Sequence, residues 1–389
     1  MSELNKTALL HRYGGIGDIF PVSVAAKQLH KRGWTVDLAL REDGPMRQID
    51  LFENCKYINK TINYSQRGPW GNRMVPYEDG YKSIETIYDD YDMVIDYMNI
   101  IEGNSTCKST AIKKSTDAWQ MTRNSNYVNW CDQHIAWAGI DPTSVPDDEK
   151  RPDLVLSKKE QSIVKKIKKQ FKTIIGIHPM ASSLARTWYQ VKELMPLLQK
   201  EYPEALLIGW DPQSNDWMFH SASGEKIEIP VDSPIRRSMV VVALCSVYVT
   251  VDTGFAHVAE GLGVKHVCIY STVPWWTRAK YYKHQTHIDM GIEHPEYYTF
   301  SLRAGDPLNI EEGMDNLTER ESKLKGLMDK KTASDIISRE LNTDGQGLKM
   351  EVECLNKKLQ SFERIQSKAI SSVTPEMVLE KIKELLNEQ

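Results

Sequence analysis

The sequence predicts an α/β protein with two doubly wound, Rossmann-like domains that face each other across a cleft, followed by a helical C-terminal segment. Short apolar runs with the alternation typical of β-strands are repeatedly followed by segments with apolar residues at helical spacing. This order is the order of βαβ units. Residues 141–152 carry three prolines and a cluster of acids, and they separate two such series. We therefore expect domains at residues 1–150 and 151–310, with residues 311–389 as a helical insertion and a closing helix.

The composition excludes several classes of protein. A chain of 389 residues with 41% hydrophobic and 26% charged residues is long enough for two globular domains. A net charge of -4 argues against a protein that coats nucleic acid, although a local basic groove would be compatible with it. The six cysteines form no CxxC pair, so neither a disulfide framework nor a structural zinc site is expected. No signal peptide or membrane-spanning run is recognisable, which predicts a cytoplasmic location.

The first domain opens with a strand, a glycine-rich loop, a helix and a second strand. The strands are expected at residues 7–11 and 34–40, and the helix ends at residues 31–33 with two cations and a glycine. The loop at residues 13–18 does not have the GxGxxG spacing of a dinucleotide fingerprint. The other elements expected in this domain are a long surface loop over residues 59–83, a strand over 91–97 and a helix over 127–138.

The second domain repeats the alternation. Its helix at residues 157–171 carries one apolar stripe and many lysines, and we interpret the lysines as a solvated face rather than a membrane or nucleic-acid surface. Residues 311–363 are charged and poor in aromatics, and Thr374 caps a final helix. Strands are expected at residues 173–178, 205–208, 226–229, 247–251 and 266–270, and further helices at 188–200 and 235–245.

The strongest signal for a binding site lies at residues 247–264. A strand over residues 247–251 breaks at residues 252–254, and helical spacing follows. The free N–H groups and the dipole at the start of such a helix favour an anion. Asp252 and His257 add two ionisable groups at the carboxyl edge of a buried strand, where open α/β sheets bind ligands.

Three turns are expected to point into the cleft, at residues 14–18, 178–188 and 252–257. Hydroxyl groups, an arginine and a helix N-terminus from the second domain would form a site for a diphosphate. The carboxylate of Asp18, from the first domain, would be available as a base for a neutral hydroxyl group.

These turns resemble glycosyltransferase family 9, the ADP-heptose:lipopolysaccharide heptosyltransferases and their relatives, which have the two-domain GT-B fold. The likeness covers the first forty residues and most of residues 173–271. Residues 14–20 resemble the family's N-terminal Gly-x-Gly-Asp segment, residues 176–188 its GIHPGAS…K/R-x-W segment, residues 251–257 its D-[ST]-G-x-x-H element, and residues 369–386 its closing helix.

The resemblance implies inverting, metal-independent transfer of a heptose-like sugar to a hydroxyl of a glycan acceptor such as lipopolysaccharide core. The donor would be a nucleotide-diphosphate sugar, with ADP as the expected nucleotide and no further cofactor. Residues 1–150 would bind the acceptor and residues 151–310 the donor, in the cytoplasm or at the inner membrane face. Asp18 would be the catalytic base. The expected donor-binding residues are Ser182, Ser183, Arg186, Asp211, Asp252, Thr253, Gly254 and His257, and the acceptor-side loop contains Gly14, Gly15 and Gly17.

Other interpretations remain open from the sequence. Asp18 could cap its helix, Arg186 could form a surface ion pair, and His257 could be structural. The segments at residues 59–83 and 311–363 depart from the compact heptosyltransferase pattern, which leaves phage DNA or protein as alternative acceptors. A non-catalytic sugar-nucleotide-binding module is a further alternative, whereas the missing fingerprint disfavours an NAD-dependent enzyme. The sequence does not identify the base of the nucleotide, the sugar, the acceptor or the oligomeric state.

Overall fold

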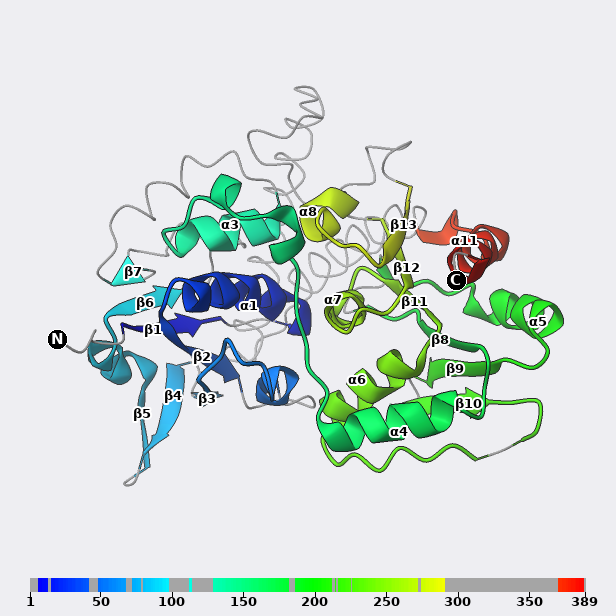
Figure 1. The fold of residues 1–389 in the computed structure, drawn as a ribbon, viewed down its shortest axis with the longest axis horizontal. Helices are drawn as coiled ribbons and strands as arrows, with labels where there is room; N and C mark the ends of the chain where they lie inside the picture. The colour runs from blue at the N-terminus through cyan, green and yellow to red at the C-terminus, as the bar shows by residue number, and fades with distance from the viewer. Residues whose placement is uncertain are drawn as a thin grey trace, which may run out of the picture.

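The computed structural model contains two mostly parallel β-sheets, each with helices packed on it, and the two sheets lie in separate halves of the molecule (Figure 1). The predicted class of two doubly wound α/β units is therefore confirmed. The boundaries at residues 150 and 310 stay predictions. The structure describes residues 6–12, 15–41, 48–67, 72–77, 80–97, 112–113, 129–181, 186–211, 214, 216–224, 226–271, 274–290 and 370–387.

The first half has a seven-stranded sheet in the order β5-β4-β3-β2-β1-β6-β7, in which β3, β2, β1 and β6 run parallel. Residues 8–11 of β1 are buried, because both faces of this central strand are covered. The strands are β1 (Thr7–His11), β2 (Thr35–Arg41), β3 (Lys60–Arg67), β4 (Asn72–Tyr77), β5 (Gly80–Ser83), β6 (Met93–Asp96) and β7 (Ile112–Lys113). The helices are α1 (Ile16–Lys31) and α3 (Trp130–Trp137), with 3-10 turns η1 (Gln48–Phe52), η2 (Ile84–Asp90), η3 (Pro142–Ser144) and η4 (Asp147–Glu149).

The prediction of a long surface loop at residues 59–83 is wrong. This segment forms β3, which pairs in parallel with β2, and then β4 and β5, which extend the sheet as antiparallel strands. Tyr64 and Val75 are buried against Tyr88 and Tyr91 on one face of this extension. The glycines and the two prolines suggested a loop, but the spacing of aromatic and β-branched side chains along the face decides the structure.

The second half has a six-stranded sheet in the order β10-β9-β8-β11-β12-β13, parallel except for β10 at the edge. The predicted strand at residues 226–229 is wrong, because residues 216–220 form the edge strand instead. Strand β13 and helix α8 were not expected from the sequence. The strands are β8 (Ile174–His178), β9 (Leu206–Asp211), β10 (Asp216–His220), β11 (Val247–Val251), β12 (His266–Tyr270) and β13 (Gln285–Asp289). The helices are α4 (Lys158–Lys168), α5 (Val191–Glu201), α6 (Pro234–Leu244), α7 (Gly254–Gly261), α8 (Trp275–Ala279) and α11 (Pro375–Asn387).

The closing helix α11 packs beside α5 on the second half (Figure 1). Val378 and Ile382 are fully buried on its inner side. The segment just before α11 is tied to the same half, because the Trp188 indole Nε1 donates a hydrogen bond to the Val373 carbonyl at 2.9 Å. The residues 311–363, predicted as an inserted helical segment, lie outside the described residues.

The two halves contact each other at several places. Asn129 Nδ2 at the start of α3 donates to the Trp276 carbonyl in α8 at 2.8 Å. Ser233 Oγ, which caps α6, donates to Asp50 Oδ2 in η1 at 2.6 Å. Between these contacts, the first turn of α1 lies against the first turn of α7. No helix in the described part of the chain is long and apolar enough to cross a membrane.

Candidate active site

Asp18 lies in the first turn of α1, directly after the carboxyl end of β1. Its Oδ2 accepts the backbone N–H of Gly15 at 2.7 Å, so it does cap the helix, as one interpretation of the sequence proposed. Its Oδ1 lies 3.3 Å from NH2 of Arg12, a buried arginine whose NH1 donates to the Tyr97 carbonyl. The side chain remains 25% exposed, so the carboxylate is oriented by two partners and still accessible to a ligand.

Arg186 and Asp252 lie at the point where strand order reverses in the second sheet. Arg186 follows β8, Asp252 follows β11, and these two strands are parallel neighbours. Arg186 NH1 donates to the Asp252 carbonyl at 3.1 Å and to its Oδ2 at 3.3 Å. Open α/β sheets bind ligands at this kind of reversal. The arginine that the sequence analysis assigned to a diphosphate therefore lies where this class of fold binds ligands.

The turn after β11 has the predicted form. Thr253 is the N-cap of α7, and its Oγ1 accepts the N–H of Phe255 at 3.3 Å. Gly254 is the first residue of the helix, so its N–H is one of the groups that lack a partner within the helix. These groups and the helix dipole supply partial positive charge next to Arg186.

Two glycines let the halves approach closely at this place. A Cβ atom on Gly254 would lie 2.8 Å from Cβ and Cγ2 of Ile16 and 3.0 Å from the backbone N of Gly17. A Cβ atom on Gly17 would lie 3.5 Å from Cδ2 of His257. The first turn of α1, which holds Asp18, is therefore in van der Waals contact with the N-terminal end of α7.

His257 connects the halves but carries no charge near neutral pH. It is buried, its Nδ1 shares a hydrogen bond with the Tyr282 hydroxyl, and the centroids of its ring and the Phe20 ring are 5.4 Å apart. Burial lowers its pKa to about 4, against the opposing charges of Asp252 and Asp18. His257 can offer a ligand a hydrogen bond rather than a positive charge.

Two further predicted residues have hydrogen-bond partners in their own turns. Asp211 ends β9 and accepts hydrogen bonds from the backbone N and the Oγ of Ser214, at 3.1 and 2.6 Å, which close its own turn. Gly15 is exposed as the N-cap of α1. The predicted residues Gly14, Ser182 and Ser183 lie outside the described residues.

Arg278 belongs to this cluster, although the sequence analysis did not assign it to the site. It lies in α8, after the carboxyl end of β12, and Ala279 of the same helix shares a buried apolar cluster with Ala256 of α7. At this place its charge is attracted by Asp252 and Asp18 and repelled by Arg186. Burial lowers its pKa to about 10. Arg278 follows β12, the neighbour of β11, and this position was the signal in the sequence that could have identified it. Its helix α8 has only five residues, which is too short to show helical periodicity.

Among the described residues, the cluster has one positive charge in excess. Arg12, Arg186 and Arg278 contribute three cations, while Asp18 and Asp252 contribute two carboxylates. Such a site favours an anion between the halves. Among the described residues, no group of three or more His, Cys, Asp or Glu side chains could hold a metal ion.

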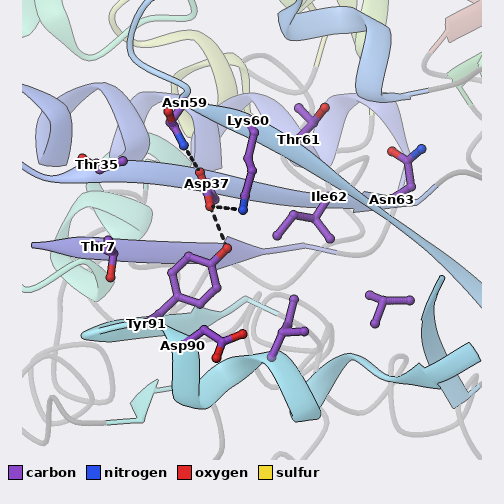
Figure 2. Close-up of a pocket in the computed structure, with 12 residues that line it drawn as sticks. Thr7, Thr35, Asp37, Asn59, Lys60, Thr61, Ile62, Asn63, Asp90 and Tyr91 are labelled. Atoms are coloured by element: carbon purple, nitrogen blue, oxygen red, sulfur yellow. Dashed lines mark hydrogen bonds and ion pairs between the residues drawn. The ribbon is translucent and has the colours of Figure 1, made fainter. Parts of the chain in front are cut away.

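A pocket of about 610 Å³ lies elsewhere, at the amino ends of β1, β2 and β3 (Figure 2). Its buried carboxylate is Asp37, which accepts hydrogen bonds from Asn59 Nδ2 at 2.8 Å and the Tyr91 hydroxyl at 2.6 Å, with Lys60 Nζ at 3.4 Å. These protein groups satisfy the carboxylate. The pocket is at the opposite end of the strands from Asp18, so we do not include it in the candidate site.

Three buried histidines predict a loss of stability in mild acid. Burial lowers the pKa of His178, His257 and His266 to about 4, whereas an unfolded imidazole titrates near 6.5. Between these values the unfolded chain binds more protons, so the free energy of unfolding falls as pH decreases from 6.5 towards 4. We expect the free energy of unfolding, measured by urea denaturation, to be lower at pH 5 than at pH 7 by on the order of 1 kcal/mol for each imidazole.

Matched variants isolate the origin of this pH dependence. His266→Gln removes a fully buried imidazole away from Asp18, and should flatten the slope of unfolding free energy against pH. His220→Gln removes an exposed imidazole and should leave the slope unchanged. Equal slopes in all three proteins would contradict the assignment.

Comparison with known proteins gives a family and a fold. The profile of glycosyltransferase family 9 (heptosyltransferase) matches residues 89–298, more than half of the chain. The structure is similar to the glycosyl transferase family 9 protein from Veillonella parvula DSM 2008, at 11% identity and TM-score 0.54, over 100% of this chain and 99% of that one. E. coli heptosyltransferase WaaC with ADP is similar over 73% of this chain and 93% of its own, at 14% identity and TM-score 0.46. E. coli ADP-heptose lps heptosyltransferase II is similar over 81% of this chain and 99% of its own, at 15% identity and TM-score 0.43. A search of curated protein sequences finds no match.

Proposed function

The chain belongs to glycosyltransferase family 9 and has the GT-B fold, and from that premise we propose that it is an inverting, metal-independent glycosyltransferase. The proposed donor is a nucleotide-diphosphate sugar, with ADP as the nucleotide and a heptose-like sugar. The proposed acceptor is a hydroxyl group of a glycan such as lipopolysaccharide core. The second half would bind the donor and the first half the acceptor.

One observation carries this proposal. A carboxylate from the first half, Asp18, lies on the helix turn that contacts the start of α7 in the second half. Arg186 and the first N–H groups of α7 are the cationic side of this contact. A base and an anion site from separate halves are the two parts that direct displacement at a sugar carbon requires.

The chemistry follows from this arrangement. Asp18 would accept the proton of the acceptor hydroxyl while the hydroxyl oxygen attacks the anomeric carbon of the donor sugar. The bond from that carbon to the diphosphate oxygen breaks, and its electron pair stays with the diphosphate. Attack from the side opposite the leaving group inverts the anomeric configuration. Arg186 and the N–H groups of α7 would stabilise the charge that develops on the diphosphate, and they would do so more strongly in the transition state than before it.

Thermal and urea unfolding with nucleotides tests the donor site. A nucleoside diphosphate at a hundred times its dissociation constant should raise the free energy of unfolding by about 2.7 kcal/mol. ADP, UDP and GDP are compared, and ADP is expected to give the largest increase. The Arg186→Gln variant should lose most of it, while Lys166→Gln, which removes an exposed lysine of α4, should retain it.

Two results would contradict the proposal. The absence of a shift with all three nucleotides would reject the donor site. Nucleotide binding without any release of ADP from ADP-heptose in the presence of a lipopolysaccharide core acceptor would instead favour a non-catalytic binding module.

A further inference from the structure

Arg278 is held in place from the opposite half of the molecule. Its guanidinium carbon lies 2.9 Å from the centroid of the Trp130 ring, which is the first residue of α3. Its own helix α8 belongs to the second half and is joined to α3 by the hydrogen bond from Asn129 to the Trp276 carbonyl. Attraction between a guanidinium group and the face of a ring restricts the position of the group, while its N–H donors can still bind a ligand.

The charge of Arg278 has no direct partner in the described part of the chain. No carboxylate oxygen there lies within 4 Å of its nitrogens, whereas Arg12 and Arg186 each have one. Asp18 and Asp252 attract Arg278 from further away, and Arg186 repels it. An arginine that is partly removed from water without an ion pair is costly, and an anion would relieve that cost.

Two arginines that repel each other suit a ligand with more than one negative charge. A diphosphate has oxygens on both phosphorus atoms, and two guanidinium groups on different sides can bind them at once. As the bond to the sugar breaks, the leaving oxygen gains charge, so a cation directed at it stabilises the transition state more than the bound donor.

We propose that Arg278 is a second catalytic cation that contacts the departing diphosphate together with Arg186, and that Trp130 of the first half positions it. This proposal rests on the proposed function. In the transfer step Arg278 makes and breaks no covalent bond: the electron pair of the broken bond stays on the diphosphate, and the hydroxyl proton goes to Asp18.

The arrangement connects leaving-group stabilisation to the contact between the halves. Arg186 is held by Asp252 within the second half, so it can bind a diphosphate whether or not the halves are together. Arg278 lies over the ring of Trp130 in the first half, so its full contribution requires that contact. Departure of the diphosphate is therefore favoured only when the half that carries Asp18 is in place.

Substitution of Arg278 tests the catalytic role. Arg278→Gln should lower kcat by about 100- to 1000-fold, the usual cost of removing one stabilising donor, and should weaken binding of inorganic pyrophosphate measured by calorimetry. Arg278→Lys retains the charge without the planar fork and should recover only part of the rate. Lys280→Gln removes an exposed charge two residues away and should have wild-type activity and pyrophosphate affinity.

Chemical rescue and Trp130 variants test the positioning. Added guanidinium should restore activity to a truncated Arg278→Ala variant and leave Lys280→Gln unaffected. Trp130→Ala should lower kcat at least tenfold with little change in ADP affinity, while Trp130→Phe, which retains a ring, should stay near the wild type. A variant that had only lost stability would instead show a lower unfolding midpoint with kcat per folded molecule unchanged.

The outcomes separate this inference from the proposed function. The wild type could bind nucleotides and transfer sugar while Arg278→Gln has the same kcat and pyrophosphate affinity as Lys280→Gln. In that case the role proposed for Arg278 is rejected and the proposed function stands. If the wild type binds neither a nucleoside diphosphate nor pyrophosphate, the proposed function fails and this inference fails with it.

Discussion

Replacement of Asp18 by asparagine is expected to lower kcat by about 100- to 10,000-fold, the usual contribution of a general base. Asparagine has nearly the same shape and retains an oxygen that can accept the Gly15 N–H, so the cap of α1 survives. It cannot take a proton from the acceptor. The dissociation constant of ADP should change little, because the proposed nucleotide contacts lie in the second half.

The same substitution distinguishes the two roles of this carboxylate. Asp18 is both a cap and the partner of Arg12, so some loss of stability is expected and is measured separately by urea denaturation. Asp141→Asn is a suitable control, because Asp141 caps η3 by accepting the Thr143 N–H and lies away from the α1–α7 contact. Wild-type turnover in Asp18→Asn with reduced stability would mean that the residue is only a cap.

The sequence was sufficient to predict the elements that form the second half of the site. β11 is a buried strand of five residues in which valines alternate with Tyr248 and Thr250. Thr253 and Gly254 mark the start of the next helix. The periodicity of apolar residues and the residue types found in turns are local signals, so they can be recognised without knowledge of the fold. The same holds for Asp18, which follows a buried strand and a glycine-rich turn.

The errors arise where local composition and tertiary packing disagree. The glycines and the two prolines of residues 59–83 are typical of a loop, yet Tyr64 and Val75 pack on a buried apolar layer. Residues 226–229 have strand-like composition, but residues 216–220 pair with β9 instead. Arg278 was missed for a related reason, since its importance comes from Trp130, which is 148 positions earlier in the chain and in the other half.

The contact between Gly17 and Gly254 joins residues far apart in the sequence, so no local pattern could have predicted it. Its disruption is expected to have a large effect on kcat. Gly254→Ala should lower kcat by about 100-fold, because a displacement of about 1 Å at a catalytic group costs on that order. The new methyl group would meet Ile16 at 2.8 Å and the Gly17 backbone at 3.0 Å, so α1 must move away from α7. That movement carries Asp18 away from the proposed leaving group.

The effect should come from the separation of the halves rather than from damage to α7. Gly254 does not have a positive φ, so alanine can adopt its backbone conformation, and the N–H group at the helix start is retained. Overpacking of this size costs about 1–3 kcal/mol of stability, and ADP affinity should fall much less than kcat.

Gly209→Ala is the matched control, because a Cβ atom there meets nothing within 4 Å, and it should leave kcat unchanged. Equal kcat in the Gly254→Ala variant and the wild type would mean that transfer does not require the observed contact between α1 and α7. The base and the anion site would then have to meet in another arrangement of the two halves.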